Sequence, residues 1–289
     1  MTVKPMVYVV LLSWNNWRDT FSCLHSLEAM DYGNWRALIV DNGSKDDSVQ
    51  RLREAFPAVT LIENGRNLGF TGGCNVGMRY ALEHAADYIW LLNNDTTVDS
   101  SALNRMVDCA EQHSDVGAVG SVVYWMDNPK QIQAWGGGYV NFWIGRSRLY
   151  RRPVRDSALG YIFGASIMIR RAVLETIGLL DEGFFTAWEE TDFCFRARAA
   201  GWRLATATEA VIYHKWSASF VGKNDFLDAH FTRSARRFFE KHGRTPRLSF
   251  WMGVALSILK RIVVGRWKTI PAVWPGYFDR AQTPRTPSA

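Results

Sequence analysis

Carboxylates gather in one stretch of the chain, beside large aromatic side chains. The segment Asp181 to Asp192 reads Asp-Glu-Gly-Phe-Phe-Thr-Ala-Trp-Glu-Glu-Thr-Asp and includes Glu189 and Glu190. Apolar neighbours raise the pKa of a carboxylic acid, which makes its ionised form a better proton acceptor near neutral pH. The same acids also suit the positive end of a helix dipole, and Asp192 precedes Arg196 by one helical turn. The segment predicts a general base, and a structural role stays open for each acid.

Possible metal ligands follow two other apolar segments. The sequence Leu91-Leu-Asn-Asn-Asp-Thr-Thr-Val98 carries Asn93, Asn94 and Asp95 directly after an apolar run, and His214 ends another one. A hard divalent cation that bridges phosphates prefers carboxylate ligands at such a strand end. A lone Asp after a strand is more often a cap, and a lone His is more often a structural residue. Taken separately, these residues favour the structural interpretation.

A glycine-rich passage runs from Glu63 to Gly77. Glycines at a strand-to-helix connection let backbone N–H groups approach a phosphate near a helix N-terminus. The passage lacks the Lys-Ser/Thr ending of a P-loop and the spacing of a dinucleotide fingerprint. The sequence therefore favours neither nucleotide hydrolysis nor nicotinamide chemistry.

Alternating strands and helices must position these residues. Unbroken apolar runs are typical of strands buried on both faces of a parallel sheet. The predicted order is strand Val7–Leu12, helix Arg18–Met30, strand Ala37–Val40, helix Asp46–Ala55, strand Val59–Glu63, helix Gly73–Glu83 and strand Tyr88–Leu92. Ligands bind outside the carboxyl ends of such strands. We therefore expect an α/β fold in which the loops starting at Ser13, Asp41, Asn64 and Asn93 share one crevice.

The pattern changes in the second half of the chain. Residues 125 to 160 combine a Gly136-Gly-Gly138 run with several arginines, which predicts a mobile insertion that acts as a lid or on the acceptor side. Regular structure is predicted to resume at Ala165. A helix is expected from Glu189 to Ala200, with Gly201 as its C-cap.

The order of these motifs resembles that of glycosyltransferase family 2, the inverting enzymes of the glycosyltransferase A-type fold. The likeness is greatest to its bacterial rhamnosyltransferase-like members and spans roughly residues 5 to 220. The motifs that carry it are Val40-Asp-Asn-Gly-Ser44, Asn67-Leu-Gly-Phe70, Leu91-Leu-Asn-Asn-Asp95, and Trp188-Glu-Glu-Thr-Asp-Phe193 followed by Arg196-Ala-Arg198. The resemblance implies a mostly parallel central sheet and a nucleotide diphosphate sugar as donor.

The resemblance also implies a role for each motif. The Ser13 to Asn15 loop and Asp41 would hold the nucleotide base, and Asn67, Gly69 and Asn75 would line the path of the ribose and diphosphate. Asn93 stands where the family's Asp-x-Asp motif has its first acid, so it is assigned with Asn94 to nucleotide-sugar binding.

The remaining assignments concern the metal and the chemistry. By resemblance Asp95 and His214 would hold Mg²⁺ or Mn²⁺, although Asn93 brings no formal charge to that cation. Glu190 matches the family's general base, and Glu189 and Asp192 complete the catalytic candidates. The base removes the proton of an acceptor hydroxyl while its oxygen attacks the anomeric carbon, which inverts that centre.

These implications predict a transferase of cell-surface polysaccharide synthesis that acts on a glycan or lipid-linked acceptor. dTDP-rhamnose is the first donor expected, and UDP-galactofuranose, UDP-galactose and UDP-N-acetylglucosamine are alternatives. Two other functions stay open. One is a catalytically silent scaffold that binds nucleotide sugars, suggested by Asn93 and the basic tail, and the other is a sugar nucleotidyltransferase.

Composition and charge suggest two regions. The chain has 289 residues and a net charge of +6, and residues 231 to 289 hold 12 Lys and Arg against only Glu240 and Asp279. We expect a catalytic domain over residues 1–230 and a basic, helical tail over residues 231–289. Four widely spaced cysteines and a short apolar run near the N-terminus predict a cytoplasmic protein with reduced thiols.

The tail combines basic and apolar residues. Leu248 to Leu259 is apolar, is too short to span a bilayer, and is flanked by arginines and lysines. This pattern predicts peripheral attachment to the inner leaflet of the membrane. Packing against the catalytic domain or a homodimer contact is the alternative. Nucleic acid is not expected as a partner, because aliphatic runs interrupt the basic residues.

Overall fold

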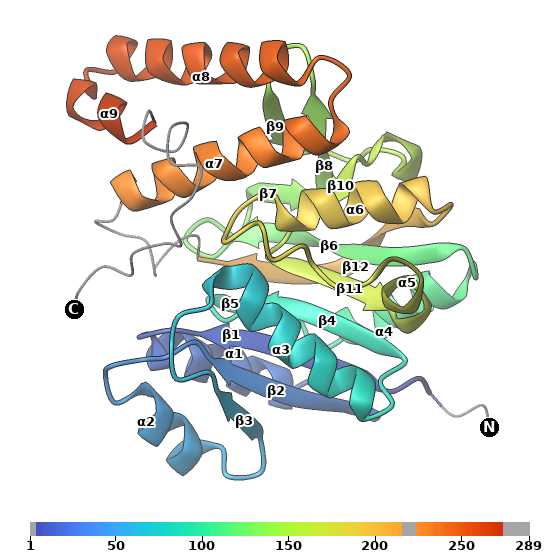
Figure 1. Ribbon diagram of the computed structural model, residues 1–289. Helices are drawn as coiled ribbons and strands as arrows, with labels where there is room; N and C mark the ends of the chain where they lie inside the picture. The colour runs from blue at the N-terminus through green and yellow to red at the C-terminus, as the bar shows by residue number, and fades with distance from the viewer. Residues whose placement is uncertain (1–3, 216–223, 274–289) are drawn as a thin grey trace.

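A curled β-sheet forms the centre of the protein, with helices on both faces (Figure 1). The computed structural model describes residues 4–215 and 224–273. Within these residues the sheet has 12 strands in the order β10-β8-β7-β6-β11-β4-β1-β2-β3, while β12 pairs with β5 and β6, and β9 pairs with β8. The strands are β1 (Val7–Ser13), β2 (Trp35–Asp41), β3 (Thr60–Glu63), β4 (Tyr88–Asn93), β5 (Thr96–Val98), β6 (Val116–Trp125), β7 (Ile132–Trp135), β8 (Gly137–Asn141), β9 (Arg146–Leu149), β10 (Tyr161–Ile162), β11 (Ser166–Arg170) and β12 (Arg203–His214).

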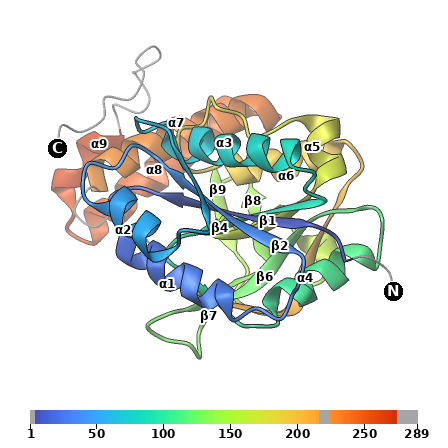
Figure 2. The ribbon, with the colours of Figure 1, turned by 90° about the horizontal axis from the view of Figure 1, so that it is seen from below.

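The sheet separates two of the three core clusters, and helices cover each of them. The helices are α1 (Trp17–Glu28), α2 (Ser48–Ala55), α3 (Gly69–Glu83), α4 (Ala102–Glu111), α5 (Arg171–Ile177), α6 (Glu189–Ala199), α7 (Asn224–His242), α8 (Pro246–Val263) and α9 (Ile270–Val273), with the short 3-10 turns η1 (Asp156–Ala158) and η3 (Trp267–Thr269). Figure 2 shows α1 and α4 on one face of the sheet and α3, α5 and α6 on the other. One buried cluster lies under each set, so the sheet is apolar on both faces.

The α/β fold predicted from the sequence is confirmed, but its sheet is mixed rather than mostly parallel. Strands β1, β2, β3 and β4 pair in parallel, which brings their carboxyl ends to one edge. Strand β11 then enters antiparallel between β4 and β6. Among the described strands, β12 adds one more parallel pairing, to β6. The apolar runs that suggested parallel strands come mainly from the first part of the chain.

The region from residue 125 to 160, which we expected to be a mobile insertion, contains regular structure. Strands β7, β8 and β9 lie in it and, together with β10, extend the sheet antiparallel. The glycines that suggested a loop make this tight pairing possible. A Cβ on Gly137 would lie 1.8 Å from the carbonyl oxygen of Tyr161, and one on Gly138 would lie 2.1 Å from that of Arg148.

The helix in the glycine-rich passage begins earlier than predicted. Helix α3 begins at Gly69 rather than near Gly73, so most of these glycines lie inside the helix. A Cβ on Gly73 would lie 2.3 Å from the Leu12 side chain, and one on Gly77 would lie 2.4 Å from that of Val10. The small residues let α3 lie close against β1.

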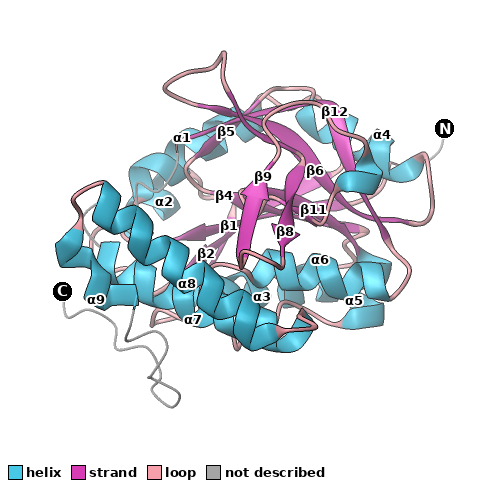
Figure 3. Cartoon of the chain, turned by 90° about the horizontal axis from the view of Figure 1, so that it is seen from above, coloured by secondary structure: helices cyan, strands magenta, loops and turns pink. Residues whose placement is uncertain are grey.

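The C-terminal helices pack on the catalytic part of the chain. Helix α7 runs across residues 230 and 231, so the expected domain boundary falls inside a helix. Its side chains Phe238 and Phe239 join a third core cluster with Trp188. Figure 3 shows α8 lying across α7 on the outside of the molecule. The final segment of the expected tail, residues 274–289, lies outside the described residues.

Candidate active site

A crevice of about 200 Å³ lies at the carboxyl ends of β1, β4 and β12. Its walls come from eight separate parts of the chain, including the start of α3, the loop before α6 and the first turn of α7. The lining residues are Leu12, Trp14, Asn42, Asn67, Gly69, Phe70, Asn93, Asn94, Asp95, Phe163, Phe185, Thr186, His214 and Phe226. The expected gathering of strand-end loops around one crevice is therefore confirmed, and we call this cavity the crevice below.

The two expected metal ligands meet in the crevice. Asp95 Oδ1 lies 3.2 Å from His214 Nε2, and both side chains are buried. Strand β12 pairs with β5, which places His214 opposite Thr96 and so beside Asp95. The second ring nitrogen of His214, Nδ1, lies 2.9 Å from Gln133 Oε1. This contact occupies Nδ1, so Nε2 is the ring nitrogen that faces Asp95.

This geometry fits a divalent cation. Two acceptor atoms that face each other at 3.2 Å repel each other unless a proton or a cation lies between them. The Asn93 Nδ2 amide is 3.3 Å from the same Nε2 atom. In the part of the chain that the structure describes, no group of three or more His, Cys, Asp or Glu side chains is placed to hold a metal. The protein thus offers two ligands, and a bound cation would need further oxygens from a ligand such as a diphosphate.

The β2 end forms a second polar feature beside the crevice. Asp41 Oδ2 accepts hydrogen bonds from the N–H groups of Gly43 and Ser44, at 3.0 Å each. Its other oxygen, Oδ1, is buried and has no hydrogen-bond partner among the described residues. The N–H of Asn15 donates to Ser44 Oγ, and Asn15 Oδ1 accepts from the Lys45 N–H, which joins the β1 and β2 loops. Asp41 therefore has an acceptor available for a ligand N–H group.

Asn42 organises the entrance to α3, a role that we did not predict. Its Nδ2 donates to Asn67 Oδ1 and to the Gly69 carbonyl, while its Oδ1 accepts from the Leu68 N–H. Gly69 has φ +76°, and a Cβ there would lie 2.4 Å from the Phe185 carbonyl oxygen. Asn67 and Gly69 thus shape the crevice wall. Asn42 belongs to the Val40–Ser44 motif, and its place in that motif is the sequence signal that could have indicated this role.

Three of the residues assigned to nucleotide-sugar binding have other partners. The Ser13 hydroxyl is buried and bonds with Thr20 Oγ1 at 3.0 Å. Asn94 lines the crevice, but its amide donates to the same Thr20 oxygen. Asn75 joins α3 to the backbone of Leu180 through both amide atoms. Ser13 and Asn75 therefore do not contribute side chains to the crevice, because buried polar groups must be paired and theirs are used within the protein.

Glu189 and Glu190 are the first two residues of α6. Burial raises the pKa of Glu189 well above its usual range, and the charge of Glu190 adds to this. Burial also raises the pKa of Glu190, to about 7, although the backbone N–H groups of Glu190 and Thr191 partly offset it. Oε2 of each glutamate is buried without a hydrogen-bond partner among the described residues. A carboxylate of this kind is matched to proton transfer near neutral pH.

The turn between β10 and β11 links Glu190 to the crevice. A Cβ on Gly164 would lie 3.3 Å from the Glu190 side chain, so the glutamate passes close to this glycine. The preceding residue, Phe163, lines the crevice, and its ring centre lies 5.8 Å from that of His214. The predicted base and the predicted metal ligand thus flank one short turn.

The third catalytic candidate, Asp192, is turned away from the crevice. It is fully buried and forms ion pairs with Arg196, Lys241 and His242 at 2.8, 2.8 and 2.7 Å. Burial alone would raise the pKa of Asp192, but the hydrogen bonds from His242, Lys241 and Arg196 lower it to about 2. Asp192 therefore joins α6 to α7, and we correct its catalytic assignment to a structural one.

The backbone before α6 is strained. Ala187 and Trp188 both have left-handed conformations, with φ of 64° and 71°. Residues other than glycine adopt this region at a cost, so surrounding contacts must hold it. Helix α7 supplies them: the Ser234 hydroxyl donates to the Thr186 carbonyl at 2.8 Å, and the Phe238 ring centre lies 4.8 Å from that of Trp188. The C-terminal helices thereby fix the start of the glutamate-bearing helix.

Solved glycosyltransferases share this architecture. A mannosyltransferase from Pyrobaculum calidifontis in complex with GDP-Man and Mn²⁺ aligns with a TM-score of 0.63 and 16% identity, over 95% of this chain and 74% of that one. GalNAc-T7 with UDP, GalNAc and Mn²⁺ gives a TM-score of 0.65 and 14% identity, over 81% and 48% of the two chains. At these identities the likeness shows the fold alone, which is the glycosyltransferase A-type fold.

The sequence comparisons define the family. The model of glycosyl transferase family 2 matches residues 8–178. The chain belongs to this family, and the protein is a glycosyltransferase. The matched residues include Asp41, Asn67 and Asp95 and stop before Glu190 and His214, so the geometry above carries the argument for those two.

Several proteins named as rhamnosyltransferases or galactofuranosyltransferases are similar to this chain in sequence. An N-acetylglucosaminyl-diphospho-decaprenol L-rhamnosyltransferase from Mycobacterium tuberculosis is 25% identical over 219 residues, which cover 67% of this chain and 71% of that protein. A galactofuranosyltransferase of the same species is 27% identical over 190 residues, or 61% and 59% of the two chains. A dTDP-rhamnosyl transferase from Shigella flexneri is 23% identical over 198 residues, or 66% and 62%.

Proposed function

We propose that this glycosyltransferase moves a sugar from a nucleotide diphosphate donor to a hydroxyl of a glycan or lipid-linked acceptor, with inversion at the anomeric carbon. We propose dTDP-rhamnose as the first donor to test, because relatives named as rhamnosyltransferases occur among its matches. UDP-linked sugars are the alternatives. The setting that we propose is cell-surface polysaccharide synthesis on the cytoplasmic side of the membrane.

The observation that carries the proposal is the placement of two chemical groups around one turn. On one side, Asp95 and Nε2 of His214 face each other in the crevice. On the other, Glu190 lies beside Gly164 with a pKa of about 7. Sugar transfer needs a group that receives the acceptor proton and a site that stabilises the departing diphosphate, and it needs them close together.

Each residue then has one task. Glu190 Oε2 receives the proton of the acceptor hydroxyl. Glu189 provides a second buried carboxyl group beside it. Asp41 Oδ1 accepts an N–H group of the nucleotide base, while Asn67 and Asn93 face the ribose and diphosphate. Asp95 and His214 would hold Mg²⁺ or Mn²⁺, which supplies charge neutralisation for a diphosphate leaving group.

The test is a thermal-shift panel of dTDP, UDP and their sugars, each with and without Mn²⁺. A ligand that binds only the folded state raises the unfolding midpoint. At one hundred times its Kd, it adds about 2.7 kcal/mol to the free energy of unfolding. We expect a shift with dTDP-rhamnose that needs Mn²⁺ and is lost in Asp95→Ala. The exposed acid Asp127, which follows β6, provides the control variant Asp127→Ala, and this variant should shift like the native chain.

Other outcomes of the panel distinguish the rival functions. Ligand binding without transfer to any acceptor would support a silent scaffold, which the neutral Asn93 in the crevice favours. Product formation that depends on a sugar 1-phosphate and a nucleoside triphosphate would support a nucleotidyltransferase.

We further propose that the outward face of α8 contacts a membrane surface. Apolar side chains at helical spacing are exposed along it, and we call them the outer stripe: Leu248, Trp251, Met252, Ala255, Leu259 and Val263. Exposed Trp143 and Trp267 lie on the neighbouring segments. Exposed basic residues flank the stripe, and the sequence has no Asp or Glu between Glu240 and Asp279. A basic, apolar face rich in Trp suits anionic lipid headgroups.

The structure is compatible with attachment to one leaflet. In residues 4–215 and 224–273, no helix is long and apolar enough to cross a bilayer. The inner face of α8, with Phe250 and Val254, packs against α7, so the helix lies flat on the protein. The two alternatives for the tail, packing on the protein and membrane contact, thus apply to different faces of α8. Its inner face packs against α7, and its outer face is the one that we propose contacts the membrane.

Liposome flotation tests this contact. The native chain should float with vesicles that contain phosphatidylglycerol and less with pure phosphatidylcholine, and added salt should weaken the association. The double variant Trp251→Glu, Leu259→Glu should stay at the bottom of the gradient. Lys130→Glu changes an exposed charge far from α8 in sequence and should float normally. Equal flotation of the double variant would contradict the proposal.

A further inference from the structure

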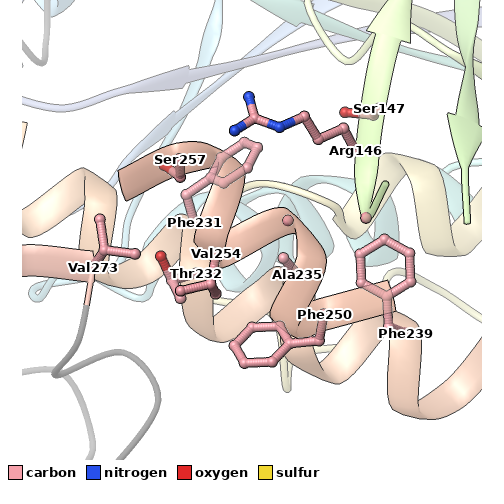
Figure 4. A pocket seen from close by; sticks show the side chains of 12 residues that line it. Arg146, Ser147, Phe231, Thr232, Ala235, Phe239, Phe250, Val254, Ser257 and Val273 are labelled. Atoms are coloured by element: carbon pink, nitrogen blue, oxygen red, sulfur yellow. The ribbon is translucent and has the colours of Figure 1, made fainter. Parts of the chain in front are cut away.

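A second pocket, of about 130 Å³, lies between α7, α8, α9 and the start of β9. Figure 4 shows apolar side chains of the three helices around it, with the Arg146 side chain reaching in from β9. Phe231, Phe239, Phe250, Val254 and Val273 form most of its wall. None of these residues lines the crevice, so the pocket is a separate feature.

The pocket combines an apolar wall with an uncompensated cation. Arg146 is half-buried, its Nε has no hydrogen-bond partner among the described residues, and no described carboxylate lies within ion-pair distance of it. Burial and the charges of Arg148 and Arg261 lower the pKa of Arg146, though a guanidinium stays charged at physiological pH. Arg261 already has a partner in Asp228. A half-buried charge without a counter-ion is costly, so the site favours an anion.

The pocket also lies close to the catalytic helix. The Phe231 ring centre lies 5.8 Å from that of Trp188, and the Phe239 ring centre lies 5.4 Å from it. Both phenylalanines line the pocket, and Trp188 directly precedes Glu189 and Glu190. A molecule in the pocket would therefore be separated from the glutamates by one layer of aromatic side chains.

The adjoining surface suits a molecule with an apolar chain. Val254 and Gly253 of the pocket wall belong to α8, whose opposite face carries the outer stripe. Hydroxyl groups of Ser147 and Ser257 lie in the wall near the arginine. An apolar chain can fill the space between the helices while a phosphate pairs with the guanidinium, whose forked donors match phosphate oxygens.

We propose that the second pocket binds an anionic amphiphile, with its apolar chain between α7, α8 and α9 and its phosphate or diphosphate on Arg146. This inference rests on the transferase function proposed above, because it makes the pocket the anchor of a lipid-linked acceptor. A membrane phospholipid has the same chemistry and is the other possible source.

Calorimetric titration of the full chain, without any donor, tests the proposal. The probes are farnesyl diphosphate, inorganic diphosphate and lyso-phosphatidylglycerol. Farnesyl diphosphate should bind at least about tenfold more tightly than inorganic diphosphate, because the chain contributes apolar burial. Arg146→Gln should weaken this binding by about tenfold or more, because it removes a charge-assisted hydrogen bond. Val254→Phe should block it by filling the pocket.

Matched measurements separate the possible outcomes. Arg148→Gln removes an exposed charge from the same strand outside the pocket wall and should bind like the native chain. Preference for farnesyl diphosphate over lyso-phosphatidylglycerol supports an acceptor lipid, and the reverse supports a membrane lipid. Binding that Arg146→Gln and Val254→Phe leave unchanged, or no binding of either amphiphile, overturns the inference. The nucleotide panel is independent of these titrations, so a failure of the donor assignment would be recognised separately.

Discussion

The two glutamates that begin α6 differ in their exposure and in the residues around them. Glu189 is 5% exposed and lies near Cys74, whose pKa it helps to raise, whereas Glu190 is more accessible and lies beside Gly164. Both carry a carboxyl oxygen that the protein leaves without a partner among the described residues. At the residue scale, such buried carboxyl oxygens without partners lower the stability of the folded chain.

The pKa of Glu190 predicts the pH dependence of transfer. A base must be ionised, and the Glu190 carboxyl is protonated below its pKa of about 7. We expect kcat/KM to rise with pH through about 7 and then level off. Glu190→Gln should lower kcat by about a hundredfold or more while nucleotide binding is retained. A native pH profile in this variant, measured by sugar transfer, would refute the role of Glu190.

Glu189 makes a different prediction, which concerns stability. Its folded pKa is raised above the unfolded value of about 4.5. The folded chain therefore holds a proton that the unfolded chain has lost, and stability falls as pH rises above about 4.5. Glu189→Gln removes this penalty, so its unfolding midpoint at pH 8 should exceed that of the native chain by at least about 2 °C. At pH 4 the two midpoints should agree, and a loss of stability at pH 8 would contradict the burial argument.

At the scale of elements, the contact between α3 and β1 sets the shape of the crevice. Helix α3 begins at the crevice wall with Gly69, and its Gly73 and Gly77 allow close approach to the strand that ends there. Ordinary helix propensity favours Ala over Gly by about 1 kcal/mol. The contact with Val10 opposes that preference, because the added methyl has no room.

The Gly77→Ala variant therefore tests whether the gain in helix propensity or the contact with Val10 has the larger effect on stability. We expect it to destabilise the protein by about 1–3 kcal/mol, because overpacking exceeds the gain in helix propensity. Gly33→Ala is the matched control, since a Cβ there meets nothing within 4 Å and its φ is not in the left-handed region. Chemical denaturation of both variants measures the difference. Equal or greater stability of Gly77→Ala would show that α3 can shift away from β1.

At the scale of the whole molecule, the C-terminal helices and the catalytic part form one structure. Helix α7 lines the crevice with Phe226, holds the Trp188 turn with Phe238, and pairs with Asp181 through Arg237 and Lys241. The ion pairs are partly exposed and contribute little. The aromatic cluster is buried and carries most of the attachment.

Phe238→Ala should therefore affect folding and turnover together. Removal of a buried Phe costs about 3–5 kcal/mol, and it also frees the left-handed turn before Glu189. We expect kcat to fall while the KM for the donor changes little, because Phe238 does not line the crevice. Phe195→Ala contacts the same Phe238 ring but not the turn, so it is the control. A loss of stability with unchanged kcat would contradict the supporting role of α7.

The sequence predicted the strands and the crevice well, because apolar runs and strand-end residues are local signals. It also indicated the glutamate pair and Asp95 through short motifs. It could not place Ser13, Asn75 or Asp192, because an isolated polar residue gives no sign of whether its partner is a ligand or a distant part of the chain. Asp192 finds His242 fifty residues away. Likewise, the role of α7 depends on contacts across the fold and not on its own sequence pattern.

The strained turn at Ala187 and Trp188 has a consequence for the order of events during protein synthesis. The ribosome adds residues in sequence, so Glu190 emerges before α7, which begins at Asn224. A nascent chain with a complete β1–β4 sheet would therefore lack the support that fixes the base. The turn before α6 therefore gains its contacts with Ser234 and Phe238 only after α7 has been translated.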